Sequence, residues 1–216
     1  MAEAHRHFVP AAGADWLLRF YDPFTRLLGM ESSLRQLIEQ AALAPGLRVL
    51  DLGCGTGAGT LLAKRMQPGV EIVGLDPDAK ALARARSKAE RAGLAIEFVQ
   101  GFGDALPFAD ARFDRVISSF MFHHLESDQK PAVLREIRRV LRPGGNLHLI
   151  DFGGAGHGLG AFLARLVHRE ESLRANTDDN LTALMHAAGL TEAAETGQRG
   201  SLVGQLVSYR AMRSDS

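Results

Sequence analysis

The chain has 216 residues, and 25 Lys and Arg balance 25 Asp and Glu, so its formal net charge is zero. That balance argues against a dedicated nucleic-acid-binding protein, which normally carries a basic excess. The single cysteine excludes an intramolecular disulfide framework and a multi-cysteine zinc or iron–sulfur site. No apolar run approaches the ~18 residues of a membrane span, and the N-terminus does not resemble a signal peptide. We therefore expect one globular domain in the cytoplasm.

The N-terminal segment, residues 1–44, is predicted to be a helical cap. Its apolar residues recur at helical spacing in two clusters, one around Trp16 and one around Leu37. Pro23 and Gly29 interrupt this region, which predicts two short helices rather than one long helix.

The central segment, residues 45–151, alternates predicted strands and helices and forms the expected cofactor-binding core. The strands are predicted over residues 48–52, 71–75, 95–99, 113–119 and 146–151. The helices between them are predicted over residues 58–66, 78–92 and 128–141. Strands that alternate with helices pair in parallel through right-handed crossovers, so the fold class is α/β.

The C-terminal segment, residues 152–216, is predicted to contain a substrate lid and the last strands. A glycine-rich stretch leads into an amphipathic helix over residues 159–169, and a second helix is predicted over 177–188. The final strands, 191–196 and 201–212, are close enough in sequence to pair antiparallel. Neither the cap nor the lid carries a motif that identifies a substrate.

A glycine-rich loop joins the first predicted strand to its helix, in the sequence Val49-Leu50-Asp51-Leu52-Gly53-Cys54-Gly55-Thr56-Gly57. Glycines allow a tight turn and a close approach of a ligand to the main chain. In an open parallel sheet, ligands bind at the carboxyl ends of the strands, where this loop lies. Asp76 ends the second strand and can accept hydrogen bonds from both hydroxyls of a ribose. These features together predict a nucleoside-containing cofactor.

Two cofactor classes fit this loop, because Gly53-x-Gly55-x-x-Ala58 also satisfies the dinucleotide fingerprint of an NAD(P)-dependent oxidoreductase. Asp51 favours the other class, since a carboxylate two residues before the first glycine suits a cationic amine better than a pyrophosphate. The alternative for Asp51 is a cap on the loop through backbone amides. Neither Tyr21 nor Tyr209 has Lys four residues later, so the short-chain dehydrogenase pattern is missing.

Five segments carry a family resemblance, in the order Val49–Gly57, Gly74–Pro77, Leu106–Phe108, Phe113–Ser119 and Leu141–Gly145. The set resembles the class I S-adenosylmethionine-dependent methyltransferases, nearest to the ubiquinone/menaquinone-biosynthesis and related small-molecule branch. The resemblance implies a Rossmann-like, seven-stranded, mostly parallel sheet with helices on both faces and the last strand antiparallel. It also implies methyl transfer from S-adenosylmethionine to a small-molecule acceptor. The apolar side chains of the predicted helix over residues 159–169 suit an apolar or lipid-like acceptor, and the alternative is that they pack on the end of the sheet. A catalytically silent S-adenosylmethionine-binding protein is the alternative outside catalysis.

The resemblance further implies which residues surround the cofactor. The loop would run beneath the methionine and ribose portions, through Gly53, Gly55, Thr56 and Gly57. Asp51 would serve the amino end of the cofactor, and Asp76 would hold the ribose.

Five other residues complete the implied site. Pro77 would lie against the adenine, while the backbone of Ser119 and the side chain of Tyr21 would border the sulfonium end. Phe102 and Gly103 depart from the family pattern, which has Asp or Asn and then a small residue before Leu-Pro-Phe. We expect Phe102 to cover the adenine ring and the amide of Gly103 to hydrogen-bond to it.

A histidine pair, His123 and His124, follows the fourth predicted strand near the expected sulfonium. His124 is a candidate general base, because the ordinary pKa of an imidazole is close to neutrality. The alternatives are that the pair packs beneath the lid and that the reaction rests on alignment alone. Adjacent residues rarely converge on one metal ion, so no metal site is predicted.

Overall fold

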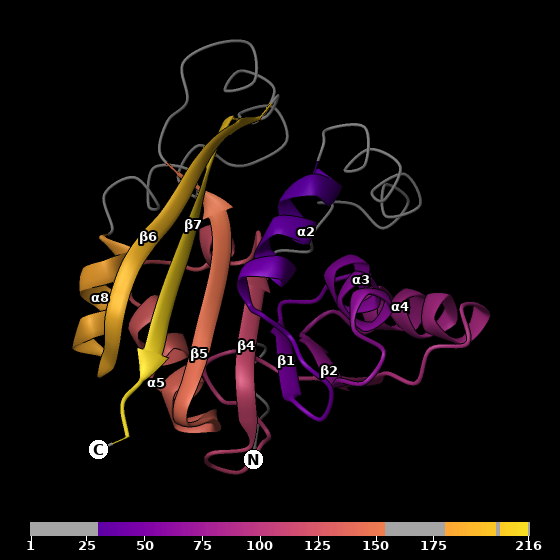
Figure 1. Ribbon diagram of the computed structural model, residues 1–216. Helices are drawn as coiled ribbons and strands as arrows, with labels where there is room; N and C mark the ends of the chain where they lie inside the picture. Colours follow the sequence, from indigo (N-terminus) through magenta and orange to yellow (C-terminus); the bar gives the residue numbers. More distant parts are fainter. Residues whose placement is uncertain (1–29, 154–179, 202–203, 216) are drawn as a thin grey trace, which may run out of the picture.

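The computed structural model describes residues 30–153, 180–201 and 204–215 (Figure 1). Within these ranges seven strands form one sheet in the order β3-β2-β1-β4-β5-β7-β6. The strands are β1 (Arg48–Leu52), β2 (Glu71–Asp76), β3 (Glu97–Gln100), β4 (Phe113–Ser119), β5 (Leu141–Phe152), β6 (Leu190–Ser201) and β7 (Gly204–Arg213). The pairs among β1 to β5 are parallel, whereas β7 is antiparallel to both β5 and β6. The predicted fold class is confirmed.

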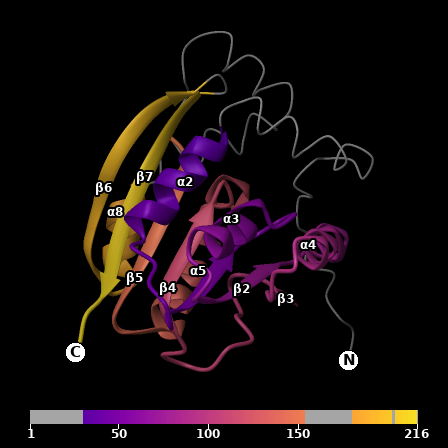
Figure 2. The same cartoon turned by 45° about the vertical axis from the view of Figure 1, so that its right-hand side comes forward.

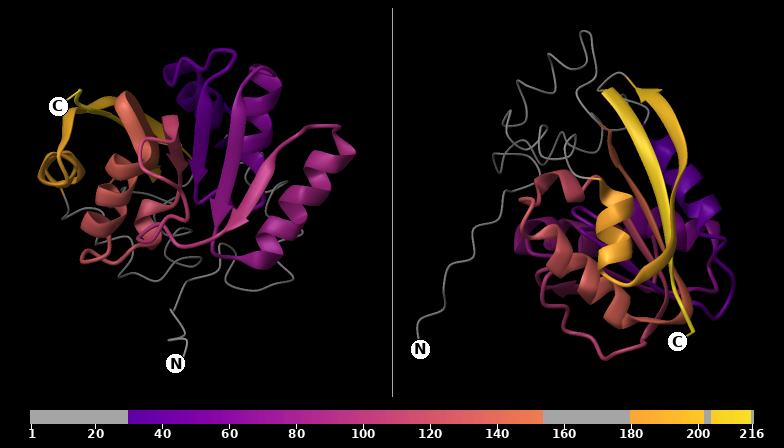
Figure 3. Two further views of the ribbon diagram at one scale, coloured as in Figure 1. Left: turned by 90° about the horizontal axis from the view of Figure 1, so that it is seen from below. Right: turned by 90° about the vertical axis from the view of Figure 1, so that its left-hand side faces the viewer.

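Helices cover both faces of the sheet (Figures 2 and 3). They are α2 (Met30–Gln40), α3 (Ala58–Met66), α4 (Ala79–Arg91), the 3₁₀ helix η1 (Phe122–His124), α5 (Lys130–Val140) and α8 (Leu181–Ala187). Successive side chains of a strand point to opposite faces, so Val49 and Leu50 of β1 enter different cores. Val49 packs with α2 and α3, while Leu50 packs with α5 and α8. Helix α4 packs on α3 through a third apolar cluster.

Helix α2 belongs to the core layer of the fold. Leu37 and Ile38 are each 2% exposed, Ala41 is fully buried, and all three pack in the cluster that contains Ile117 of β4. The sheet therefore needs the second half of the segment predicted as a cap. Residues 1–29, which hold the rest of that segment, lie outside the described residues, and so does most of the predicted lid.

Several boundaries differ from the prediction for local reasons. Helix α4 begins one residue later than predicted, because Asp78 caps it by accepting hydrogen bonds from the amides of Lys80 and Ala81. Strand β5 begins five residues earlier than predicted, because Leu141 already pairs with Phe113 across a register shift. Across the described ranges, no helix has the length and apolar character needed to cross a membrane.

Candidate cofactor site

The glycine loop turns sharply between β1 and α3 because three of its glycines have positive φ. The φ angles are +74° at Gly53, +52° at Gly55 and +81° at Gly57, and residues with a side chain rarely adopt such values. The amides of Gly53 and Cys54 donate hydrogen bonds to the carbonyl of Leu75, at 2.8 and 3.0 Å, which ties the loop to β2. The loop therefore lies at the carboxyl edge of the sheet, as predicted.

The glycines serve different purposes. A Cβ added to Gly57 would lie 2.9 Å from the side chains of Ala85 and Leu61, so Gly57 allows α3 and α4 to pack together. Among the residues that the structure describes, and apart from its chain neighbours, a Cβ added to Gly55 would meet no atom within 4 Å. The open space over Gly55 is where a ligand can approach the main chain, and this fits the predicted cofactor.

Asp76 joins the end of β2 to the middle of this loop. Its Oδ2 accepts a hydrogen bond from the amide of Gly55 at 2.8 Å, and its Oδ1 accepts one from the amide of Asp78 at 2.9 Å. Burial raises the pKa of Asp76, although these two hydrogen bonds oppose the effect. Each carboxylate oxygen has a second lone pair, so the side chain can also accept from a ribose.

Asp51 is 1% exposed at the end of β1. Its Oδ2 accepts a hydrogen bond from the hydroxyl of Thr60 at 2.6 Å, so its partner is in α3. Burial raises the pKa of Asp51 to about 6; the hydrogen bond from Thr60 opposes this, and the charge of Asp76 adds to it. A cationic group of a ligand would favour the ionised carboxylate, and the amine of S-adenosylmethionine is such a group.

The first turn of α3 passes close to Asp51 and Ser119. A Cβ added to Gly59 would lie 3.3 Å from Oδ2 of Asp51, 3.7 Å from Leu34 of α2 and 3.8 Å from the hydroxyl oxygen of Ser119. The ends of β1 and β4 thus meet beneath α2 at one point. Sequence reasoning missed Gly59 and Thr60, because nothing in the local sequence distinguishes them from ordinary residues of the first turn of a helix.

The chain after β4 turns back over the glycine loop. Phe120 has φ of +55°, which is uncommon for a residue with a side chain. The side chain of Met121 then lies so close to Gly53 that a Cβ there would overlap it. Met121 was not predicted as a site residue, because no local pattern distinguishes it from a core methionine.

The adenine-side residues follow β2 and β3. The side-chain amide of Gln100 donates a hydrogen bond to the carbonyl of Pro77 at 3.0 Å, and the amide of Gly101 donates to the carbonyl of Asp76 at 3.2 Å. A Cβ added to Gly103 would lie 3.4 Å from the side chain of Val133. Pro77 and the segment around Gly103 thus border the same carboxyl edge, which is compatible with their predicted role.

Both histidines belong to η1, directly after β4. The ring of His124 lies 3.9 Å from the ring of His123, between centroids, and is partly exposed. His123 is buried against Asp151 of β5, a partner that the sequence did not predict.

Tyr21 lies outside the described residues. Among the residues that the structure describes, no three His, Cys, Asp or Glu side chains gather as a metal site would require.

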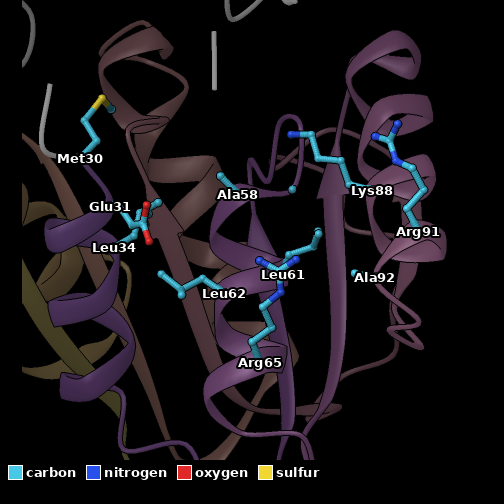
Figure 4. A pocket seen from close by; sticks show the side chains of 11 residues that line it. Met30, Glu31, Leu34, Ala58, Leu61, Leu62, Arg65, Lys88, Arg91 and Ala92 are labelled. Atoms are coloured by element: carbon cyan, nitrogen blue, oxygen red, sulfur yellow. The ribbon is translucent and has the colours of Figure 1, made fainter. Parts of the chain in front are cut away.

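A pocket of about 400 Å³ opens beside the loop, between α2, α3 and α4 (Figure 4). It shares Gly57 and Ala58 with the loop, and its lining combines apolar side chains from α2 and α3 with charged ones. Lys88 extends from α4 toward the loop and donates a hydrogen bond to the carbonyl of Thr56 at 2.9 Å. Lys88 therefore stabilises the conformation of the glycine loop from the side of this pocket.

Comparison with known proteins decides which cofactor class fits this geometry. Residues 49–145 match a family model described as a methyltransferase domain. These residues are a class I methyltransferase domain. S-adenosylmethionine is the methyl donor of this family, so the predicted family and cofactor class are confirmed. The alternative of an NAD(P)-dependent oxidoreductase is not supported.

Two curated relatives support the methyltransferase domain. A demethylmenaquinone methyltransferase of Thermus thermophilus is 40% identical over 135 residues, which covers 61% of this chain and 60% of the relative. A demethylmenaquinone methyltransferase of Deinococcus radiodurans is 38% identical over 149 residues, covering 68% of this chain and 61% of the relative. The chain thus spans about three fifths of the length of these relatives.

A solved structure supports the fold of the methyltransferase domain independently. The YcgJ protein from Bacillus subtilis has a TM-score of 0.71 to this chain at 21% sequence identity. The alignment covers 86% of this chain and 99% of that chain. At this identity the likeness concerns the fold alone, and it agrees with the seven-stranded order observed here.

Proposed function

We propose that the protein transfers a methyl group from S-adenosylmethionine to a small quinol-type acceptor with apolar character. The observation that carries the transfer is the methyltransferase domain over residues 49–145, whose loop leaves open space above Gly55. The acceptor class is supported by the two relatives named demethylmenaquinone methyltransferase, which are 40% and 38% identical to this chain over 135 and 149 residues. When bound, S-adenosylmethionine supplies an electrophilic methyl group on a positively charged sulfur.

The chain's own residues hold the donor in this proposal. Asp51 binds the cationic amine, and its buried position makes that charge pair strong. The backbone from Gly53 to Gly57 supports the methionine and ribose portions. Asp76 accepts hydrogen bonds from the ribose while it holds the amide of Gly55.

A second group of residues surrounds the base and the reacting end. Pro77 and Phe102 cover the adenine ring, and the amide of Gly103 hydrogen-bonds to it. Ser119 borders the sulfonium end from β4, and Tyr21 does so from the N-terminal segment. Their shared position at one sheet edge supports this assignment for the four of them that the structure describes.

The main catalytic demand is alignment, because holding the acceptor close to the methyl group removes most of the entropic barrier. His124 is proposed as the group that accepts a proton from the acceptor. Its partly exposed ring follows β4, the strand that ends at Ser119. The choice of acceptor is proposed to depend on the predicted cap and the predicted lid, most of which lie outside the described residues.

The test uses the full chain, methyl-labelled S-adenosylmethionine and a demethylmenaquinone-type substrate in its reduced and oxidised forms. We expect labelled product from the quinol and none from the quinone, because the quinol ring is the more nucleophilic. Calorimetry with S-adenosylhomocysteine and with NAD(P) provides the binding control. If calorimetry detects binding of S-adenosylhomocysteine but no quinol gives a labelled product, the protein binds the cofactor without the proposed activity.

A further inference from the structure

A buried histidine–carboxylate pair lies beside the proposed site. Asp151 of β5 is 1% exposed, and its Oδ1 lies 2.7 Å from Nδ1 of His123, which is 2% exposed. The Oδ2 of Asp151 also accepts a hydrogen bond from the amide of His123 at 3.1 Å. A buried carboxylate is costly unless it is paired and hydrogen-bonded, so this geometry holds His123 in one orientation.

The pair also determines the tautomer of His123. An ionised carboxylate only accepts hydrogen bonds, so Nδ1 of His123 carries the hydrogen that it donates to Asp151. The lone pair of the neutral ring is then on Nε2. Burial alone would raise the pKa of Asp151, but the hydrogen bonds from His123 and from the amide of Phe152 outweigh it, together with the positive charge of His123 whenever its ring is protonated. The net pKa is below its ordinary value, and the carboxylate stays ionised near neutral pH.

The imidazole ring of His124 packs against the ring of His123. The centroids of the His123 and His124 rings are 3.9 Å apart and the rings are tilted by 41°. The amide of His124 donates to the carbonyl of Met121 at 3.0 Å, which fixes η1 beneath the rings. A proton that arrives on His124 would therefore be close to the negative charge of Asp151.

The two histidines follow β4, and Asp151 is near the end of β5, so all three belong to the carboxyl edge of the sheet at which the glycine loop lies. The amide of Phe120 donates to the carbonyl of Ile150 at 2.9 Å, so the segment after β4 runs from Met121, over Gly53, to the end of β5. Gly53 and Asp151 are two strand spacings apart in the sheet, roughly 10 Å. In the proposed function, the reacting end of the cofactor would lie between Gly53 and the histidines.

Another titratable group faces Asp151 from the neighbouring strand. Tyr209 of β7 has its pKa raised to about 12, mainly by burial and then by the charges of Glu195 and Asp151. Its phenol therefore stays neutral over the range of about pH 5 to 8 in which an imidazole titrates. Asp151 places a negative charge beside the ring of His123, and a nearby negative charge favours the charged form of an imidazole in general.

We propose that Asp151, His123 and His124 form one proton-accepting unit, in which His124 receives the proton and the buried pair positions it and supplies the compensating charge. This proposal rests on the proposed function and identifies the acceptor as one that must lose a proton. For each methyl group gained, an O–H or C–H bond of the acceptor breaks and its electron pair stays with the acceptor. The proton goes to His124, and the electron pair of the former sulfur–methyl bond stays with the donor sulfur. An acceptor that keeps all its hydrogens, such as a tertiary amine, would gain nothing from the unit.

The experiment compares single-turnover methyl transfer as a function of pH in the full chain and in variants, with S-adenosylhomocysteine affinity measured on each. In the wild-type protein the rate falls as pH drops through the imidazole pKa. We call this fall in rate at low pH the acid limb of the profile. His124→Gln lowers the rate by about 10²–10⁴-fold and removes the acid limb. Asp151→Asn lowers the rate at least about tenfold and moves the limb to lower pH, since the charge that favours the imidazolium is lost. The Kd for S-adenosylhomocysteine stays within about threefold in all variants.

Two further variants separate positioning from a general structural effect. Glu126→Gln removes an exposed carboxylate three residues from His123 and leaves both rate and limb unchanged. If Asp151→Asn does not fold, His123→Asn is measured instead. The side-chain amide of the asparagine can still donate a hydrogen bond to Asp151, whereas the imidazole ring that packs against His124 is lost. That variant is expected to lose at least about tenfold in rate and to keep an acid limb.

A flat pH profile in the wild-type protein overturns the proton-accepting unit while the proposed function stands. So does an acid limb that Asp151→Asn leaves in place, or a His123→Asn rate within about threefold of wild type. Failure of the wild-type protein to bind S-adenosylhomocysteine overturns the proposed function instead, so the two failures are distinct.

Discussion

Asp76 and Gly55 are 21 residues apart in sequence, yet the carboxylate of the first accepts a hydrogen bond from the amide of the second at 2.8 Å. The contact joins the end of β2 to the point of the glycine loop where the main chain is open to a ligand. One side chain thus shapes the loop and stands beside the expected ribose. Its replacement is therefore expected to affect binding through both effects.

Asp76→Ala is expected to weaken S-adenosylhomocysteine binding by about 1.5–3 kcal/mol, the range for hydrogen bonds to a charged group. Calorimetry measures the change in Kd, roughly 10- to 150-fold. Asp78→Ala is the matched control, because it removes the cap of α4, costs about 1 kcal/mol of folding stability and leaves the affinity nearly unchanged. An unaltered Kd in folded Asp76→Ala would show that the ribose is held elsewhere.

Gly55→Val and Gly57→Ala are expected to fail in different ways. A Cβ at Gly55 meets no atom of the described residues within 4 Å apart from its chain neighbours. The valine side chain therefore occupies the proposed path of the cofactor, and the variant loses cofactor binding more than Asp76→Ala does, while backbone strain at φ +52° costs roughly 1–2 kcal/mol. A Cβ at Gly57 collides with Ala85 and Leu61, so that variant loses mainly stability. Thermal denaturation with and without S-adenosylhomocysteine distinguishes them. A ligand-induced stabilisation retained in Gly55→Val contradicts the proposed approach of the cofactor.

Local sequence predicts some elements of this fold well. The bounds of β1, α3 and β4 agree with the prediction residue for residue. The parallel pairing followed from the alternation with helices, and the antiparallel last strand followed from the family resemblance, whereas the order of the strands in the sheet was not predicted. The start of β5 could not be predicted, because Pro143 and its neighbouring glycines suggest a turn, and the pairing of Leu141 with Phe113 is not local.

The candidate site was only partly predictable, because its partners come from distant segments. Asp51 and Asp76 stand in a motif, but nothing local shows that Thr60 donates to Asp51. The pairing of His123 with Asp151 requires β4 and β5 to be neighbours with a known register. The positive φ of Phe120 leaves no signal in composition, since glycine usually occupies such positions.

Removal of residues 1–29 is expected to leave a folded domain that binds cofactor weakly and transfers no methyl group. The expectation of folding rests on α2, which begins at Met30 and keeps Leu37 and Ile38 in the core. Removal of residues 1–41 is the control and should abolish cooperative unfolding, since it exposes that apolar cluster. Circular dichroism and the transfer assay check both variants. Full activity without residues 1–29 would contradict a covering role for that segment.

The buried carboxyl of Asp51 is expected to oppose folding at neutral pH while it binds the cofactor. Its pKa is about 6 in the folded protein against an ordinary value of 3.8, so between these values the folded state binds more protons than the unfolded state. Ionisation therefore lowers the free energy of unfolding above pH ~6, by up to roughly 3 kcal/mol. That penalty disappears as pH falls toward 4.

Asp51→Asn is accordingly expected to melt at a higher temperature than the wild-type protein at pH ~7.5 without cofactor, and the difference should shrink through pH ~6. The same variant should bind S-adenosylhomocysteine much more weakly, because the amine loses its counter-charge. In the wild-type protein the affinity should fall as pH drops below about 6, where Asp51 takes up a proton. Glu39→Gln, which changes an exposed carboxylate of α2, should show neither effect. A lower melting temperature in Asp51→Asn at pH ~7.5, or an affinity independent of pH, would show that Asp51 is stabilised by the protein itself and not by its ligand.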